Sequence, residues 1–212
     1  MGGRVEGKVA LVTGAANGQG AAHARLLAQE GASVLCLDVH VKAGEDVGAG
    51  IRDAGGDARF HPLDVGDPAQ WAAAVEAAVE LWGRIDVLVN NAGIIRLEDF
   101  VTETVEGWND VIRVDQFGVF LGMKHVIPVM LDQRSGSIIN ISSNMGIAAI
   151  PDYAAYHAAK GAIVLMTKNA AVTYGPRGIR VNTICPGMVW TAMSEGHEAN
   201  QPIIDVTPLR RG

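Results

Sequence analysis

The sequence predicts an α/β protein of the doubly wound class, in which helices cover both faces of a parallel sheet. Three observations indicate this class. Short apolar runs alternate with longer segments of helical pattern along most of the chain. The runs are apolar at consecutive positions, which is typical of parallel strands buried on both faces. Each run is also followed closely by Gly, Asn, Asp, Ser or Thr, and ligands bind beyond the carboxyl ends of such strands.

Turn residues set the bounds of the expected elements. The first run ends at Thr13-Gly14, and the helical pattern after it stops at Gly31. Asp38 closes the second run, and the helix after that ends at Gly55-Gly56. A proline near its start and a glycine after its end mark the third helix, the usual asymmetry of helix termini. We expect strands at 9–12, 33–37, 58–61, 87–89, 137–141 and 179–183, and helices at 20–30, 42–54, 68–82, 108–131 and 153–174.

Composition narrows the range of partners. The chain has 212 residues, 49% of them apolar, and a formal charge of −6 without a basic stripe, so nucleic acid is not an expected partner. Its two cysteines lie far apart and suggest neither a disulfide framework nor a metal site. No uninterrupted apolar run approaches the ~18 residues that span a bilayer, and residues 1–8 lack a signal-peptide core. We therefore expect one cytoplasmic domain over 1–212, with no metal and no membrane partner.

The segment T-G-A-A-N-G-Q-G follows the first strand and opens the first helix. Glycines permit a tight turn without Cβ atoms, so that backbone amides and the helix N-terminus can face a pyrophosphate. The spacing differs from G-x-G-x-x-G, but the strand–turn–helix context is the one that dinucleotide sites require. The candidate cofactor contacts here are Gly14, Asn17, Gly18, Gln19 and Gly20.

An acidic residue follows each of the next two strands. Asp38, roughly 20 residues beyond the glycines, could accept hydrogen bonds from an adenosine ribose and would repel a 2′-phosphate. No Arg or Lys stands at 15–17 or 39–40 to neutralise that phosphate, which favours NAD over NADP. The alternative for Asp38 is a surface carboxylate that caps the next turn. Asp64, with Val65, is expected either to form a rim for the adenine ring or to cap the following helix.

The last three strands are also followed by small or polar residues, at 90–93, 142–143 and 185–191. Between the last two of these segments, Tyr156 and Lys160 lie one helical turn apart and face the same way. Such a pair alone could be an aromatic ring covering a lysine stem. A phenol beside an ammonium is also an acid–base pair, because the ammonium stabilises the phenolate. The strand ends decide between these readings, since all six of them carry residues suited to a ligand site.

Together these motifs resemble the short-chain dehydrogenase/reductase family, from about Gly7 to Arg211. The resemblance rests on T-G-x-x-x-G-x-G, N-N-A-G, the serine before Y-x-x-x-K and the P-G after the last strand. The tracts G-V-F-L-G-M-K and P-G-M-V-W-T-A-M look most similar to bacterial hydroxysteroid and cyclic secondary-alcohol dehydrogenases of that family. The resemblance implies a Rossmann-type fold, hydride transfer between NAD(H) and a secondary alcohol or ketone, cyclic or steroidal substrates among the candidates, and a homodimer or homotetramer.

The resemblance also implies roles for individual residues. Tyr156 would be the general acid/base, and Lys160 would stabilise its phenolate and hold the ribose of the nicotinamide nucleoside. Ser143, thirteen residues before Tyr156, would hydrogen-bond the substrate oxygen, with Ser142 as the alternative. Thr191 would meet the nicotinamide carboxamide, and Ile94 or Asn91 would line the ribose side. The full set of implied cofactor contacts after the last three strands is Asn91, Ala92, Gly93, Tyr156, Lys160, Pro186, Gly187, Val189 and Thr191.

One departure from the family pattern concerns the long helix. The family carries Asn in a V-N-x-x-G context, whereas this chain reads V-D-Q-F-G with Asp115 in that place. An ionised Asp only accepts hydrogen bonds. A carboxylate near Lys160 would raise the pKa of that lysine and weaken its effect on Tyr156. We therefore expect Asp115 to take part in a working but altered proton relay.

A second departure concerns the end of the sequence. Family members run on past T-P-L-x-R-x-G into a further helix and a seventh strand, whereas this sequence stops at Gly212. The expected fold therefore lacks that last helix and strand. Residues 188–207 are the expected substrate lid, and Met188, Trp190 and Met193 suit an apolar substrate. Ordinary packing is the alternative for these three side chains.

Two other functions remain open at this level. The first is an NADPH-dependent ketoreductase, such as one acting on acyl thioesters, and Asp38 argues against it. The second is a nucleotide-binding regulatory or scaffold protein with little turnover. Asp115 and the missing last elements favour that alternative, whereas the complete set of Ser143, Tyr156 and Lys160 argues against it.

Overall fold

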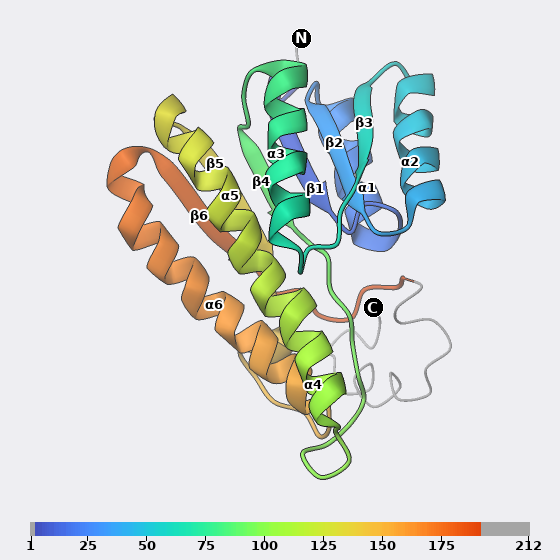
Figure 1. The fold of residues 1–212 in the computed structure, drawn as a ribbon, viewed down its shortest axis with the longest axis vertical. Coiled ribbons are helices and arrows are strands. Elements are labelled where there is room, and N and C mark those ends of the chain that lie inside the picture. Colours follow the sequence, from blue (N-terminus) through green and yellow to red (C-terminus); the bar gives the residue numbers. More distant parts are fainter. Residues whose placement is uncertain (1–2, 192–212) are drawn as a thin grey trace.

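The computed structural model describes residues 3–191, which form a six-stranded parallel sheet with helices on both faces (Figure 1). The strand order is β3-β2-β1-β4-β5-β6, so the chain reverses its direction across the sheet between β1 and β4. This confirms the doubly wound, Rossmann-type class. Residues 192–207 of the expected lid lie outside the described residues, as do Met193 and the T-P-L-R-R-G segment. The strands are β1 Val9–Thr13, β2 Ser33–Asp38, β3 Asp57–Pro62, β4 Val87–Asn90, β5 Gly136–Ile141 and β6 Ile179–Ile184.

All five predicted helices are present, and four of them match the expected bounds to within two residues. Asp67 caps α3, because its side chain accepts hydrogen bonds from the amides of Ala69 and Gln70. The fifth, predicted as one helix over 108–131, begins earlier at Val105 and contains a π-helical turn, η1, at Ile112–Phe117. Periodicity does not reveal such a turn. The α-helices are α1 Gly18–Gln29, α2 Val41–Asp53, α3 Pro68–Trp82, α4 Val105–Val111, α5 Gly118–Gln133 and α6 Ala154–Tyr174, and 3₁₀ turns occupy η2 Asn144–Gly146 and η3 Gly175–Arg177.

The sheet separates two apolar cores. In β1, Val9 and Leu11 point to the core formed with α3, α5 and α6, whereas Ala10 and Val12 point to the core formed with α1 and α2. Successive strand residues face opposite sides of a sheet, so the consecutive apolar residues of the sequence fill both cores. Trp71 of α3 is completely buried in the first core, and its indole N–H donates to the Val65 carbonyl at 2.9 Å. This bond fixes the loop after β3, which borders the site described below.

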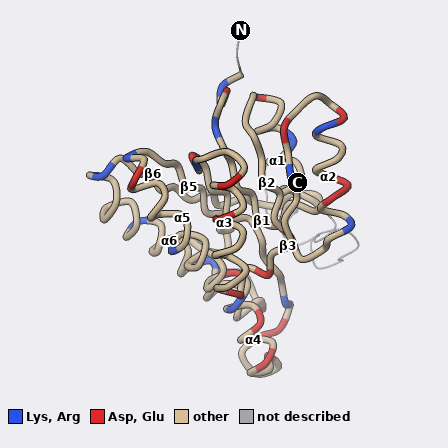
Figure 2. Tube along the Cα trace, turned by 45° about the horizontal axis from the view of Figure 1, so that its top comes forward, with Lys and Arg blue, Asp and Glu red and all other residues tan. Residues whose placement is uncertain are grey.

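The helical stretch 105–133 is 29 residues long and reaches a mean hydropathy of 1.2, enough by length and composition to cross a membrane. A search for uninterrupted apolar runs misses it, because polar residues interrupt the stretch. Half of its apolar window is buried, and Val119, Leu121, Val126 and Met130 of α5 belong to the core shared with α3 and α6. The stretch is therefore accounted for as a core helix. The Lys and Arg residues drawn in Figure 2 are spread over separate elements.

Candidate active site

A cavity of about 560 Å³ lies at the carboxyl ends of the strands, across the point where the strand order reverses. Residues that follow all six strands line it, as expected for this class of sheet. Of the predicted site residues, only Gly20 lies outside the lining. The predicted residues that the cavity brings together are Gly14, Asn17, Gly18, Gln19, Asp38, Asp64, Val65, Asn91, Ala92, Gly93, Asp115, Ser143, Tyr156, Lys160, Pro186, Gly187, Val189 and Thr191.

The turn after β1 is clamped to the end of β4. Asn91 donates from Nδ2 to the Thr13 carbonyl at 2.9 Å, and the Thr13 hydroxyl accepts from the backbone amides of Asn91 and Ala92. Gly14 has a φ of 65°, and a Cβ there would lie 2.8 Å from Asn91 Nδ2, so both conformation and space require glycine. A Cβ on Gly20 would overlap the Gly14 carbonyl. Gly20 therefore keeps α1 close to the turn and does not itself face the cavity.

Asp38 lies at the adenosine end expected for a dinucleotide and is 7% exposed. Its Oδ2 accepts from the Ala16 amide at 2.9 Å. Its Oδ1 accepts from the His40 amide at 2.9 Å and lies 2.9 Å from His40 Nδ1. Asp38 thus holds the next turn, as the capping alternative required, and lines the cavity as well. His40, which the sequence reasoning passed over, also lines the cavity.

Asp64 follows β3 and is held by Arg113 of η1. Arg113 Nη1 lies 2.8 Å from both carboxylate oxygens of Asp64, and the Gly66 amide donates to one of them. The helix that follows is capped by Asp67, so the capping alternative for Asp64 is wrong. Arg113 also lines the cavity and could not be identified from sequence, because its partner lies 49 residues away.

Ser143 and Ser142 differ in what their hydroxyls contact. The Ser142 hydroxyl donates to the Lys160 carbonyl at 2.8 Å and so anchors the end of β5 to α6. The Ser143 hydroxyl accepts from the Met145 amide at 3.2 Å and lies 3.1 Å from Asn144 Oδ1, so its contacts stay within its own turn. Of the two, only Ser143 is left without a bond to α6.

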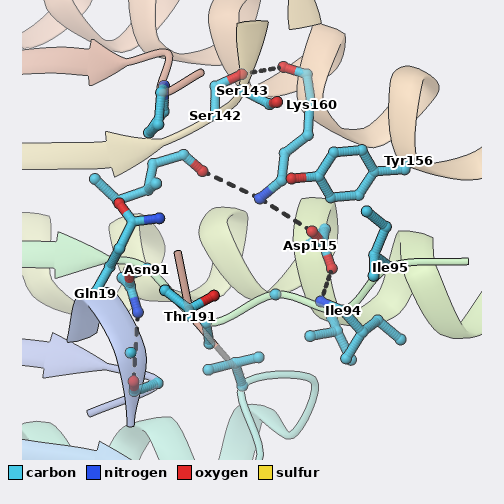
Figure 3. A pocket seen from close by; sticks show the side chains of 18 of the residues that line it. Gln19, Asn91, Ile94, Ile95, Asp115, Ser142, Ser143, Tyr156, Lys160 and Thr191 are labelled. Carbon is cyan, nitrogen blue, oxygen red and sulfur yellow. Dashed lines mark hydrogen bonds and ion pairs between the residues drawn. The ribbon is translucent and has the colours of Figure 1, made fainter. Parts of the chain in front are cut away.

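Tyr156 and Lys160 come from the first two turns of α6 and both line the cavity (Figure 3). Lys160 Nζ lies 5.3 Å from the Tyr156 ring centroid. The same nitrogen donates to the Ile141 carbonyl at 3.2 Å and forms an ion pair with Asp115 Oδ2 at 3.0 Å. Asp115 Oδ1 accepts from the Ile94 amide at 2.8 Å. The contact between Asp115 and Lys160, which the sequence only raised as a condition, is therefore present.

This ion pair is buried, with Asp115 at 0% and Lys160 at 3% exposure. Burial acts to lower the pKa of Lys160, but the charges of Asp115 and Tyr156 outweigh it and raise that pKa above its ordinary value. Burial raises the pKa of Asp115, and Lys160 opposes this shift. A Cβ on Gly93 would lie 2.8 Å from Asp115 Oδ2 and 3.3 Å from Lys160 Nζ. The pair therefore fits only because residue 93 has no side chain.

Apolar residues line much of the remaining cavity. Tyr153, which is 7% exposed, has a φ of 56°, an uncommon conformation for a residue with a Cβ. Of the expected lid residues, Met188 lines the cavity, whereas Trp190 is 56% exposed and is not part of the lining. The apolar lining residues that sequence reasoning did not single out are Val39, Leu63, Ile95, Leu97, Val114, Ile141, Met145 and Tyr153.

No cluster of three or more His, Cys, Asp or Glu suited to a metal ion occurs within residues 3–191. His157 accepts at Nε2 from the Ile150 amide, and its Nδ1 lies 2.9 Å from the Tyr153 carbonyl, so both ring nitrogens hold the backbone next to α6. Burial raises the pKa of Cys36 to about 11, which makes its thiol inert at neutral pH.

Comparison with known proteins gives one family. The sequence model described as short chain dehydrogenase matches residues 8–202. A 2,5-dichloro-2,5-cyclohexadiene-1,4-diol dehydrogenase of Sphingobium indicum is 48% identical over 187 residues, which are 88% of this chain and 75% of that protein. A 3-alpha-(or 20-beta)-hydroxysteroid dehydrogenase of Mycobacterium tuberculosis is 45% identical, over 92% and 74% of the two chains. The crystal structure of levodione reductase superposes with a TM-score of 0.93 at 36% identity, covering 98% of this chain and 86% of that one.

Removing one partner of the buried ion pair is expected to destabilise the protein strongly. Asp115→Ala leaves the Lys160 ammonium buried without its counter-charge, which should lower the free energy of unfolding by about 3–5 kcal/mol. Urea denaturation measures this change. Asp115→Ala combined with Lys160→Met should be more stable than Asp115→Ala alone, because no unpaired charge remains.

The control is the exposed pair of Lys42 and Asp46 on α2, 3.0 Å apart. Asp46→Ala should change the free energy of unfolding by less than about 1 kcal/mol. A loss for Asp115→Ala no larger than that of Asp46→Ala would contradict a stabilising role for the buried pair.

Proposed function

This chain belongs to the short-chain dehydrogenase family, and from that premise we propose that it transfers a hydride between NAD(H) and a secondary alcohol or ketone. The observation that carries the proposal is the single cavity that joins Ser143, Tyr156 and Lys160 to the glycine turn after β1 and to Asp38. One end suits proton transfer at an alcohol oxygen, and the other suits a dinucleotide. Catalysis at CH–OH groups with a nicotinamide cofactor is common to the family, whereas NAD and the substrate class are proposals for this chain.

The residues of the cavity fit a dinucleotide. Gly14 and Gly18 both have positive φ, and a Cβ at Gly14 would overlap the end of β4. The first turn of α1 meets the cavity at Gly18 and Gln19, where a helix N-terminus favours a pyrophosphate. We assign the cofactor contacts to the predicted set from Gly14 to Thr191, with Gly20 acting through packing.

The proposed mechanism assigns one task to each catalytic side chain. In oxidation, the Tyr156 phenolate takes the proton of the substrate hydroxyl, and Ser143 Oγ donates a hydrogen bond to the same oxygen. Lys160 stabilises the phenolate by its charge. The bound nicotinamide supplies the hydride chemistry. In reduction, Tyr156 returns the proton to the carbonyl oxygen. Asp115 is a positioning residue in this scheme, because it acts through Lys160.

NAD rather than NADP is proposed from the charge at the adenosine end. Asp38 is buried, and its two oxygens already hold the amides of Ala16 and His40. A 2′-phosphate would place two negative groups together in a partly desolvated site, which costs binding energy. The ketoreductase alternative requires NADPH and is disfavoured by the same contact.

An apolar cyclic alcohol is the proposed substrate class. Ile94, Ile95, Leu97, Met145 and Met188 give the cavity apolar walls. Two relatives, named for a cyclohexadienediol and for hydroxysteroids, act on ring alcohols by those names. We further propose one catalytic domain over 1–212 with a substrate lid over 188–207, a homodimer or homotetramer, and a cytoplasmic location.

A coupled absorbance screen tests the proposal. Cyclic secondary alcohols and ketones are offered with NAD(H) and, in parallel, with NADP(H), and activity is expected with NAD(H). Tyr156→Phe should keep NAD binding by calorimetry and lose turnover by about 10²–10⁴-fold, because the phenyl ring cannot carry the proton.

The control for this variant is Tyr174→Phe at the far end of the same helix, where Tyr174 contacts Arg177 and does not line the cavity. That variant should stay active. A fully active Tyr156→Phe would refute the assignment of the general acid/base. Binding of NAD without turnover of any alcohol or ketone would favour the nucleotide-binding alternative.

The ion pair predicts a pH effect on the reaction. Asp115 raises the pKa of Lys160 and offsets part of its positive charge near Tyr156. Asp115→Asn removes that offset, so the phenolate should form more readily, and kcat/KM for oxidation should rise at a pH lower by about one unit.

The measurement is a pH profile of kcat/KM with saturating NAD for the parent and the variant. Asp110→Asn is the matched control, because Asp110 is an exposed acid that lines the same cavity but lies one residue outside η1 and α4's buried face. Superimposable profiles for the parent and Asp115→Asn would show that this carboxylate does not influence the proton transfer.

A further inference from the structure

We propose that His40 is a cofactor-specificity residue, whose protonation weakens the preference for NAD(H) over NADP(H). The inference rests on the proposed function, because it assumes that Asp38 receives the adenosine ribose. The sequence reasoning searched 39–40 for a permanent cation and found none. It did not consider that a histidine at 40 becomes a cation in mildly acidic solution.

The position of His40 is fixed by two contacts with Asp38. The His40 backbone amide donates to Asp38 Oδ1 at 2.9 Å, and His40 Nδ1 lies 2.9 Å from the same oxygen. Asp38 Oδ2 is held by the Ala16 amide of the glycine turn. The imidazole therefore lies against the carboxylate that is proposed to bind the ribose. Both residues line the cavity.

The chemistry of the contact identifies which ring nitrogen carries a proton. A carboxylate only accepts hydrogen bonds, so Nδ1 must be the protonated nitrogen in this geometry. Protonation then occurs at Nε2, on a side chain that is 70% exposed to solvent. The ring can gain its charge without breaking its bond to Asp38. A second proton changes only the charge of the pair.

The two charge states give the site different electrostatics. With neutral His40, the pair carries the full negative charge of Asp38, which repels a 2′-phosphate. With charged His40, the pair is neutral overall, and a cation lies beside the ribose position. A group hydrogen-bonded to Asp38 would lie about 5–6 Å from the ring, since two hydrogen bonds of ordinary length separate them. Histidine changes its charge between pH 5 and 8, so the change falls in an accessible range.

The other charged groups around His40 do not reproduce this change. Lys42 on the first turn of α2 is held by Asp46, and Asp64 after β3 is held by Arg113. None of these four is expected to change charge between pH 6 and 8. The turn that leads into α1, residues 14–20, carries no charged side chain. The N-terminus of α2 follows His40 directly and opposes its protonation, whereas Asp38 favours it.

One further titratable group lies on the neighbouring strand. His61 of β3 pairs in register with Leu37, one residue before Asp38. Its Nδ1 lies 2.9 Å from the Pro62 carbonyl, so its ring is directed to its own strand and not to Asp38. His61 titrates over the same range as any histidine and is for that reason the matched control.

The test is a direct measurement of binding, which does not depend on turnover. Isothermal titration calorimetry gives Kd for NAD⁺ and NADP⁺ at pH 8.0 and 6.0 with the parent, His40→Asn and His61→Gln. The oxidised cofactors are used because they are stable in acid. The measured quantity is the ratio of Kd for NADP⁺ to Kd for NAD⁺, in which effects common to both cofactors cancel.

The variant separates the protein from the ligand. The 2′-phosphate itself takes up a proton near pH 6, as phosphate monoesters do, and this lowers the ratio for every form of the protein. We expect the ratio to fall about 3–10-fold more for the parent than for His40→Asn, a modest factor because the ring is exposed and screened. His61→Gln should behave as the parent does.

Two results would overturn the inference. The first is an equal fall of the ratio in the parent and in His40→Asn, and the second is the loss of the extra fall in His61→Gln instead. Tighter binding of NADP⁺ than of NAD⁺ at pH 8.0, or binding of neither, would overturn the proposed cofactor and this inference with it. A thermal melt of each variant confirms that the chain is folded before its Kd is compared.

Discussion

The buried contact between Asp115 and Lys160 is the interaction on which the catalytic end depends. It joins the π-helical turn to α6, and through Ile94 and Ile141 it reaches the segment after β4 and the end of β5. Two opposite charges are withdrawn from water there, so each requires the other. Gly93 leaves the space that the pair occupies. The positions of Tyr156 and Ser143 follow, because Lys160 lies one turn beyond Tyr156, and its carbonyl accepts from the serine next to Ser143.

The two ends of the cavity are built by different means. At the adenosine end, backbone amides from the turns after β1 and β2 converge on one carboxylate. At the catalytic end, side chains from elements far apart in sequence meet one another. The first arrangement is local and follows from short turns. The second depends on the packing of whole helices against the sheet, since Asp115 and Lys160 are separated by 45 residues of sequence.

This difference explains what could be predicted from the sequence. The strand ends were identified because turn residues mark them, and the fold class followed from the alternation of apolar runs and helical patterns. The predicted site residues line one cavity, apart from Gly20, whose missing Cβ serves helix packing. Arg113 escaped prediction because no local signal connects it to Asp64. The π-helical turn escaped because hydrophobic periodicity assumes one rise and one pitch throughout a helix. Tyr153 escaped because its left-handed backbone is a product of the surrounding packing.

The π-helical turn has a consequence for the phase of the long helix. A π turn holds one more residue than an α turn, so the faces on its two sides are offset by about 100°, the angle that one residue subtends in an α-helix. Helix α4 and helix α5 are therefore two helical wheels and not one. A single wheel drawn over 105–133 would assign the residues after Phe117 to the wrong faces. Comparison of this helix with that of any relative must accordingly be made from the sheet outward on each side of the turn.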